Sequence, residues 1–323
     1  MNYLQGDGIV SVSARCIDYS GAWLFWPLEP TEHLIRSIKE FGQLEPVLLE
    51  EQQDGYSLVS GFKRLRACQQ LERSVLGLVI CCSELEKGEI YLHSNVQGSP
   101  EPASMVLPAR FFQERCHPEE WKKIVYRTIE PFLSGKNLRL LQKWMYLDSY
   151  WDGYLLSGHI SLDTAPWLAE FGERGLKAVE PFLQCTYWSR NNAVSLVKWI
   201  YEVCKSRDIC VQDLLEECRA GRYLDRDLSP KDRQKRILEV LRAHRYPNLY
   251  SLEQDFSRLQ KETSRETGWK LIPDQNFETD RIYLQRELRA PRDLEGAIQG
   301  LLQIRDNGAL ENIRKWQGEN LEP

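Results

Sequence analysis

The sequence predicts a mixed α+β protein with three consecutive parts. Strand-like and helix-like runs alternate over residues 9–95, only helical periodicity follows for a long stretch, and the C-terminal part shows a helix–strand–strand–helix pattern. A chain of 323 residues has room for two or three domains at roughly 100–200 residues each. We therefore expect a small α/β domain over 1–98, an all-α domain over 99–220 and a small αββα domain over 221–323.

The N-terminal elements follow from alternation and from capping residues. Alternating apolar residues predict a strand over 9–18, and Thr31 is a suitable cap for a helix that reaches Phe41 and ends at Gly42. The turn Asp54-Gly55 separates two further strands. The remaining predicted elements are strands over 46–50, 56–59 and 75–82, and helices over 61–71 and 84–95.

The middle part begins after the punctuated segment 98–102. Helices are expected to start near 116–120, at Ser134 and near 161–163, and apolar residues at helical spacing support them. In the C-terminal part, Ser229-Pro230 is a typical helix start. The elements predicted beyond it are a helix from Ser251 to Gly268, strands over 269–273 and 281–288 with a turn at 277–279, and a helix over 291–307.

Composition excludes several classes of protein. No apolar run approaches the roughly 18–20 residues that a membrane span needs, and the first residues lack the features of a signal peptide, so we expect a cytoplasmic protein without a membrane partner. The nine cysteines contain no C-x-x-C pair, which favours reduced thiols over disulfides or a metal site. The net charge of -5 means that any nucleic-acid surface must come from local clustering of basic residues.

The run Ser60-Gly61-Phe62-Lys63-Arg64 follows a predicted strand and opens a helix. A helix N-terminus has free N–H donors and partial positive charge, and two adjacent cations there favour a compensating anion such as a phosphate. The alternative is a surface helix start whose basic side chains reach into solvent.

Three segments resemble the ParB family. Residues 34–49 resemble its helix, glycine and proline-bearing strand, residues 55–67 resemble the nucleotide-binding motif of the ParB/sulfiredoxin fold, and residues 94–97 with Pro102-Ala103 resemble its third pocket motif. The resemblance implies a pocket for CTP, or another nucleoside triphosphate, with Mg²⁺, and a dimer that CTP closes around DNA. The implied nucleotide-binding residues are Ser60, Gly61, Phe62, Lys63, Arg64, Asn95 and Gln97.

Two positions depart from the family pattern. Phe62 and Ser94 stand where the family has glutamates, and carboxylates are the usual means of holding Mg²⁺ or orienting a water. We therefore assign no catalytic residue and expect at most weak triphosphatase activity. Phe62 also replaces the cysteine of sulfiredoxins, and a kinase on this fold would have to use Glu45.

Basic residues gather between Trp121 and Leu147, where six cations face one acid in a chain of net charge -5. Residues 134–141 resemble the start of the ParB recognition helix, which implies base contacts from Asn137 to adenine and from Lys136 or Arg139 to guanine. The candidate DNA-binding residues are Lys122, Lys123, Arg127, Lys136, Asn137, Arg139 and Lys143. A solvated basic helix face is the alternative.

The αββα pattern resembles the ParB dimerisation domain, which implies a homodimer through residues 250–307. A two-stranded hairpin is marginal alone, and a second copy would cover it. The resemblance further implies DNA partition or nucleoid organisation, with a ParA-like ATPase as partner. Two other classes stay open: a nucleotide-dependent kinase or nuclease on this fold, and an adaptor that binds protein.

Overall fold

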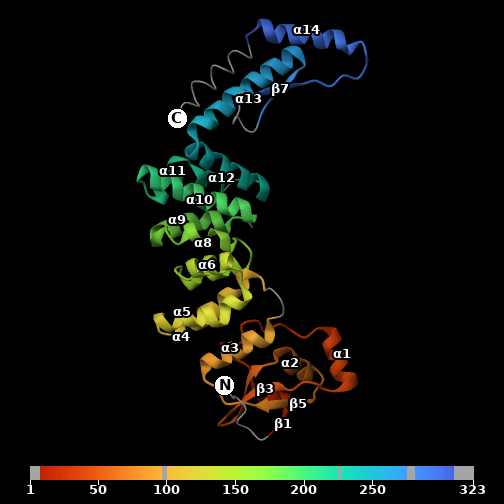
Figure 1. Ribbon diagram of the computed structural model, residues 1–323, viewed down its shortest axis with the longest axis vertical. Coiled ribbons are helices and arrows are strands. Elements are labelled where there is room, and N and C mark those ends of the chain that lie inside the picture. The colour runs from red at the N-terminus through yellow and green to blue at the C-terminus, as the bar shows by residue number, and fades with distance from the viewer. Residues whose placement is uncertain (1–7, 97–99, 225–226, 275–280, 309–323) are drawn as a thin grey trace. The chain divides into compact units, whose positions relative to one another are not determined.

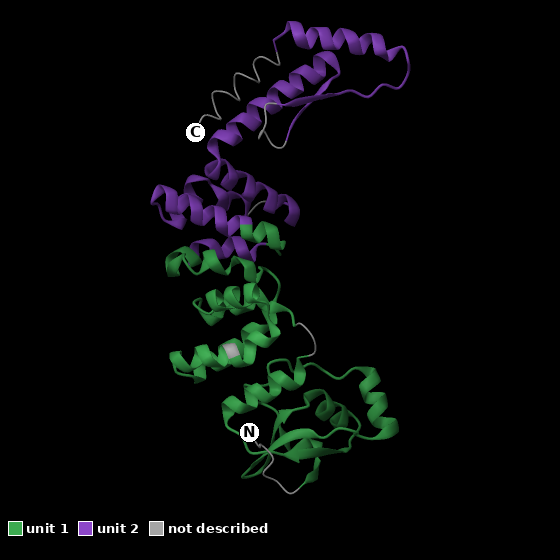
Figure 2. Cartoon of the chain, viewed as in Figure 1, with its two compact units in different colours: residues 1–176, 186–194 green, residues 177–185, 195–323 purple. Residues whose placement is uncertain are grey.

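The computed structural model describes residues 8–96, 100–224, 227–274 and 281–308. The chain is a mixed α+β protein that forms two compact units. Residues 1–176 and 186–194 make unit 1, and residues 177–185 and 195–323 make unit 2 (Figure 2). The predicted turn at 277–279 and the candidate Gln97 lie outside the described residues.

Unit 1 contains a five-stranded β-sheet near its N-terminus. Its order is β1-β5-β3-β4-β2, with antiparallel pairs β1/β5 and β3/β4 and parallel pairs β3/β5 and β2/β4. The strands are β1 (Ile9–Ser13), β2 (Ile17–Asp18), β3 (Val47–Gln52), β4 (Gly55–Ser60) and β5 (Ser74–Val79).

The strand predicted over 9–18 is two strands, which is a correction to the sequence analysis. A 3-10 turn, η1 (Ala14–Cys16), separates β1 from β2. The break is required because β1 pairs at one edge of the sheet and β2 at the other, so a straight strand cannot serve both. Buried Ala14 and Ile17 anchor the crossing on the core.

Three helices pack with this sheet: α1 (Glu32–Phe41), α2 (Phe62–Gln70) and α3 (Glu84–Asn95), seen beside the strands in Figure 1. The predicted caps are present: the Thr31 hydroxyl accepts from the Leu34 amide, and Gly42 ends α1 with φ 78°. Ser83 and Glu86 form a reciprocal capping box at the start of α3.

The rest of unit 1 is helical, as predicted. Its elements are η2 (Pro102–Met105), α4 (Val106–Arg115), α5 (Pro118–Ile124), the π-helical η3 (Val125–Ile129), η4 (Glu130–Phe132), α6 (Gly135–Trp144), η5 (Ser149–Trp151), α7 (Asp152–Leu156), η6 (Leu162–Thr164) and α8 (Ala165–Leu168). Ser134 caps α6 by accepting from the Asn137 amide, and the buried face of α6 carries Leu138, Leu141 and Trp144.

A buried ion pair holds these helices together. Arg110 of α4 and Asp152 of α7 make two hydrogen bonds of 2.9 and 3.1 Å, with side chains 12% and 10% exposed. Asp152 also accepts from the Trp144 indole at 2.7 Å, and Arg110 donates to the Leu147 carbonyl at 2.7 Å. Buried charges need such complete pairing because each one loses its hydration on folding.

Two long helices, α9 (Gly172–Gln184) and α10 (Arg190–Arg207), contribute to both units, and unit 2 continues from α10 to the C-terminal elements. These are α11 (Val211–Glu217), η7 (Ala220–Tyr223), α12 (Pro230–Arg245), α13 (Pro247–Thr267), β6 (Lys270–Pro273), β7 (Ile282–Gln285) and α14 (Asp293–Asp306). α13 starts at Pro247 rather than Ser251, because proline is well suited to a first helical turn. The two strands are shorter than predicted.

The αββα arrangement is present at the C-terminal end of unit 2. Leu252 and Phe256 of α13 pack on Leu271 of β6 in a small core, so the hairpin covers the apolar face of α13. α14 buries only part of its apolar surface, through Ala297, Gly300 and Ile304. An adjacent stripe stays exposed; it consists of Leu294, Ile298, Leu301 and Leu302, which are 38–53% exposed.

Candidate functional site

The turn from β4 into α2 is built around Gly61. Its φ of 101° and ψ of 28° are left-handed, and a Cβ there would lie 2.8 Å from Val47 Cγ1. Glycine is therefore required for both conformation and space. The Gly61 carbonyl accepts from the Arg64 and Leu65 amides at 2.9 and 3.0 Å, which starts the helix and leaves its first N–H groups without an intrahelical partner.

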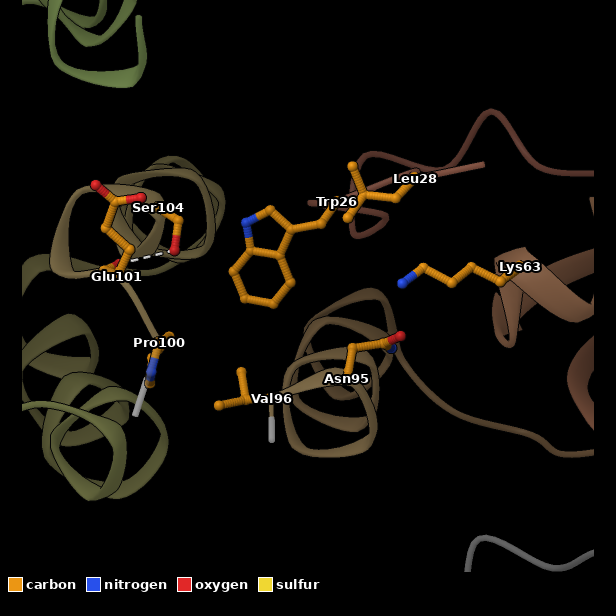
Figure 3. Close-up of a pocket in the computed structure, with 8 residues that line it drawn as sticks. All are labelled: Trp26, Leu28, Lys63, Asn95, Val96, Pro100, Glu101 and Ser104. Carbon is orange, nitrogen blue, oxygen red and sulfur yellow. Dashed lines mark hydrogen bonds between the residues drawn. The ribbon is translucent and has the colours of Figure 1, made fainter. Parts of the chain in front are cut away.

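A pocket of about 260 Å³ opens beside this helix start (Figure 3). Two residues predicted from the sequence line it from different elements: Lys63 from the first turn of α2 and Asn95 from the end of α3. Figure 3 shows the Lys63 ammonium pointing into the pocket across from the Trp26 ring. The other lining residues are Trp26, Leu28, Val96, Pro100, Glu101 and Ser104.

Ser60, Ser94 and Asn95 form a hydrogen-bonded cluster at this pocket. The Ser60 and Ser94 hydroxyl oxygens lie 2.7 Å apart, and Asn95 Nδ2 donates to Ser60 Oγ at 3.2 Å. Asn95 Nδ2 also donates to the Tyr91 carbonyl at 2.8 Å. The amide group of Asn95 is thus oriented by β4 and by its own helix, and its carbonyl oxygen is the end that can meet a ligand.

The structure places Phe62 and Arg64 away from the pocket lining. Phe62 is 7% exposed and packs edge-on against Tyr19, with ring centroids 5.7 Å apart. The Arg64 guanidinium donates to the Pro46 carbonyl at 2.6 Å and pairs with Glu45 at 3.2 Å. Phe62 therefore serves the core, and phosphate binding by Arg64 stays a prediction that requires its side chain to exchange partners.

Trp26, in the loop between β2 and α1, lines the pocket but is not among the binding residues predicted from the sequence. Its indole Nε1 is buried and has no hydrogen-bond partner among the described residues. Its backbone is held in place, since its amide donates to the Tyr91 hydroxyl at 3.3 Å and its carbonyl accepts from that hydroxyl at 3.1 Å. The part of the ring that faces the pocket suits stacking with a flat ligand. Two tryptophans in so short a loop were the available sequence signal.

The side of the pocket across from Lys63 comes from Pro100, Glu101 and Ser104, at the start of the helical part. Ser104 Oγ donates to the Glu101 backbone carbonyl at 2.8 Å, which leaves the Glu101 carboxylate as an exposed acidic group at the pocket. The sequence alone does not indicate Glu101, because the positions at which the family has glutamates are those of Phe62 and Ser94. Glu101 is the pocket carboxylate suited to a Mg²⁺ ion that accompanies phosphates.

The cysteine side chains are free thiols, and most of them are buried or partly buried. All nine cysteines are free, and burial, reinforced by the nearby Glu50 carboxylate, raises the pKa of Cys82 to about 11. Burial likewise raises the pKa of Cys204 to about 11. Within the described ranges, no group of three or more His, Cys, Asp or Glu side chains is arranged to hold a metal ion.

α6 presents a basic face. Lys136, Arg139 and Lys143 are exposed and follow an i, i+3, i+7 spacing, so they share one side of the helix opposite its buried leucines. Asn137 is half-buried and lies beside them in the first turn. Among the parts of the chain that are described, no helix is long and apolar enough to cross a membrane.

The other predicted basic residues belong to two groups. Lys122 and Lys123 are exposed at the end of α5. Arg127 instead pairs with Glu89 of α3, and Glu89 also accepts from Thr128 at 3.3 Å. Arg127 therefore joins the helical part to the α/β domain. A role in DNA binding requires its side chain to contact DNA while it keeps the ion pair with Glu89, or to give up that pair.

Arg190 is a further cation that the sequence analysis missed. Asp163 of η6 accepts from Arg190 Nη2 at 2.8 Å and from Lys136 at 3.1 Å, so it joins the starts of α10 and α6. Burial raises the pKa of the Asp163 carboxyl, but the hydrogen bonds from Arg190 and Lys136 outweigh it, and the pKa lies below its usual value. No sequence signal links these residues, because they are far apart in the chain.

Residues 27–96 match the family model of the ParB N-terminal domain. The chain is also 33% identical over 103 residues to a probable chromosome-partitioning protein ParB of Helicobacter pylori, which corresponds to 30% of this chain and 35% of that relative. The chain thus spans about a third of the length of that curated relative. Residues 27–96 of the α/β domain are therefore similar to the ParB N-terminal domain, and the likeness of the chain to ParB proteins rests on that part.

Solved structures give a weaker likeness. A C-terminally truncated chromosome-partitioning protein ParB from Caulobacter crescentus, complexed with CTP-gamma-S, is 20% identical and covers 55% of this chain and 99% of its own, with a TM-score of 0.26. The same protein complexed to the centromeric parS site is 17% identical, covers 58% and 98%, and has a TM-score of 0.34. A Pnob8-like ParB-N domain is 16% identical, covers 77% and 96%, and has a TM-score of 0.36.

Proposed function

We propose that this chain is a nucleotide-dependent DNA-binding protein that acts in DNA partition or nucleoid organisation. The observation that carries the proposal is the meeting of Lys63 and Asn95 at one pocket beside the open N-terminus of α2. This set of groups combines a positive charge, free backbone N–H donors and an amide, which together suit a phosphate chain. The ParB N-terminal domain match supports the same function.

The proposed ligand is CTP, or another nucleoside triphosphate, with Mg²⁺. The pocket volume of about 260 Å³ is slightly below the ~300–1,000 Å³ of typical ligand sites. We place the base there, against the Trp26 ring, and the phosphates along the α2 start. Glu101 is the proposed Mg²⁺ contact. With Phe62 and Ser94 at the family's glutamate positions, we expect slow hydrolysis or none.

Calorimetry of the full chain with CTP, ATP, GTP and UTP, with and without Mg²⁺, tests the pocket. Binding of one triphosphate is expected, and Lys63→Ala is expected to weaken it by about ten- to a hundredfold because a charge-assisted contact contributes roughly 1.5–3 kcal/mol. Lys39→Ala, which removes an exposed cation from α1, is the matched control. Silence of the parent protein with all four nucleotides contradicts the proposed ligand.

We propose that DNA binds along the basic face of α6 through Lys136, Asn137 and Arg139, with Asn137 and Arg139 near base edges. Lys122 and Lys123 of α5 are proposed phosphate contacts. The support is the local charge of this segment in an otherwise acidic chain and the shared exposure of its cations.

A homodimer through residues 250–307 completes the proposal. The exposed stripe on α14 supports it, since contiguous exposed leucines and isoleucines on one helix face are costly to leave in water. A symmetric dimer would place the same stripe from two copies together. A dimer also holds two DNA-binding arms on one duplex, and a ParA-like ATPase is the proposed partner in partition.

A further inference from the structure

We propose that Lys136 and Arg190 together bind one backbone phosphate of DNA, and that Asp163 positions them for it. The inference deepens the proposed function and rests on it, because it adds Arg190 and Asp163 to the DNA-binding surface. Neither residue belongs to the basic segment that the sequence indicates. Arg190 comes from the first turn of α10 and Asp163 from η6, and both lie with Lys136 in unit 1.

The Asp163 carboxylate contacts two cationic side chains at once. Asp163 contacts Arg190 through both carboxylate oxygens, at 2.8 Å to Nη2 and 2.6 Å to Nε, and it contacts Lys136 Nζ at 3.1 Å. The Asp163 side chain is 19% exposed, whereas those of Lys136 and Arg190 are 63% and 61% exposed. The Asp163 carboxylate is therefore mostly buried, and the side chains of Lys136 and Arg190 extend from it into solvent.

The three charges sum to +1, and both cations retain donors. A guanidinium has five N–H groups, and Asp163 uses those along one edge, which leaves the Nη1 side for another anion. An ammonium has three N–H groups, of which one points to Asp163. A phosphate oxygen pair suits these remaining donors, because Arg and Lys side by side provide both a planar fork and a point charge.

The backbone around Asp163 and Arg190 is anchored by buried neighbouring residues. Leu162 and Thr164, which flank Asp163, are 5% and 0% exposed. Trp188, two residues before Arg190, is 4% exposed and its amide donates to the His159 carbonyl at 3.1 Å. Exposed ion pairs contribute little to stability, about 0–1 kcal/mol. The contacts of Asp163 with Lys136 and Arg190 therefore matter more for the placement of the two cationic groups than for the free energy of folding.

DNA is the occupant because the pair continues the basic face of α6. Arg139 and Lys143 lie on the same side of that helix as Lys136, so a phosphate at Lys136 and Arg190 is in line with further cations. A duplex has regularly spaced phosphates that such a row can follow.

The test is fluorescence anisotropy of a labelled mixed-sequence DNA duplex with the full chain, measured over a range of salt concentrations. Arg190→Ala is expected to weaken binding about tenfold and to reduce the salt slope by about one, as the loss of one phosphate contact does. Arg190→Lys keeps the charge but not the fork, so the slope should persist while affinity falls by a few fold.

Asp163→Asn separates positioning from charge. It removes a negative charge from the DNA-binding side, so electrostatics alone predicts tighter DNA binding. Positioning predicts weaker binding, by about threefold or more, because both cations lose their anchor. The matched control is Glu217→Gln, which breaks a similar pair with Arg207 at the other end of α10 and should leave DNA binding unchanged.

The outcomes distinguish the two levels of the proposal. If the parent chain binds no DNA even at low salt, the proposed DNA binding and this inference both fail. If the parent binds and Lys122→Ala/Lys123→Ala weakens it, but Arg190→Ala binds as the parent does or Asp163→Asn binds more tightly, only the shared phosphate site is overturned. Circular dichroism of each variant confirms that the fold is retained, and Arg190→Lys provides the test if Arg190→Ala unfolds.

Discussion

The Ser60 hydroxyl lies 3.2 Å from the Asn95 amide nitrogen, which joins the end of β4 to the end of α3 at the pocket. Ser60 is only 6% exposed and does not line the pocket, whereas Asn95 does. Ser60 therefore acts on any ligand through the orientation of Asn95.

Ser60→Ala is expected to weaken nucleotide binding by about two- to tenfold, because a neutral hydrogen bond contributes ~0.5–1.5 kcal/mol. Calorimetric titration with the nucleotide that the parent binds measures it. Ser57→Ala removes another buried hydroxyl from the same strand, away from the pocket, and should leave the affinity unchanged. Equal affinities of the Ser60→Ala variant and the parent would show that Asn95 needs no such support.

Gly61→Ala is expected to destabilise the fold by about 2–4 kcal/mol. The left-handed conformation costs an alanine about 1–2 kcal/mol, and the new Cβ would crowd Val47. Chemical denaturation measures the change. Gly153→Ala in α7 is the control, because its Cβ would meet no atom within 4 Å and alanine favours the helix by about 0.5–1 kcal/mol. Similar stabilities of both variants would contradict the crowding at Val47.

Restoring the two glutamates should have unequal effects on folding. Phe62→Glu replaces a buried ring with a carboxylate and should cost at least about 3 kcal/mol. Ser94→Glu changes an exposed position and should cost about 1 kcal/mol, the bond to Ser60. Thermal denaturation compares them. Phosphate release with Mg²⁺ is expected to be slow in the parent and faster in Ser94→Glu; a fast parent would refute the expected loss of hydrolysis.

Asp152→Ala should destabilise unit 1 by about 3–5 kcal/mol, because it leaves the Arg110 charge buried without its partner. Replacing both residues, as Arg110→Met/Asp152→Leu, should recover part of that loss, since apolar groups fill the space without a charge. Denaturant titration of the two variants decides between these effects. A double variant less stable than Asp152→Ala would mean that the pair itself stabilises the fold.

The exposed apolar stripe on α14 predicts which substitutions weaken the dimer. Ile298→Glu should weaken association by tenfold or more, because a symmetric interface takes up the new carboxylate twice. Light scattering over a dilution series measures the change. Gln303→Glu adds the same charge at an exposed position about 140° around the helix from Ile298 and should leave the dimer intact. A parent chain that is monomeric throughout would remove the dimer from the proposal.

The sequence predicted local features well where one segment decides them. The helix starts at Thr31, Ser134 and Gly61 depend on neighbouring residues, and the structure confirms them. The sequence alone could not reveal features that arise only when segments far apart in the chain come into contact.

Trp26, Glu101 and Arg190 are examples of such features. Trp26 lies at the pocket with its backbone bonded to Tyr91 from a distant helix, and Arg190 and Lys136 are brought together by Asp163 of η6, which contacts both. The break between β1 and β2 was missed for the same reason, since it depends on which sheet edges the strands join.

The position of α3 has one more consequence. Its last residue, Asn95, lines the pocket, while Glu84 and Glu89 on the same rigid helix pair with Arg115 and Arg127 of the helical part. A ligand that favours one placement of α3 therefore also favours one placement of those arginines. Thermodynamic linkage then requires reciprocity: if the nucleotide changes the affinity for DNA by some factor, DNA changes the affinity for the nucleotide by the same factor.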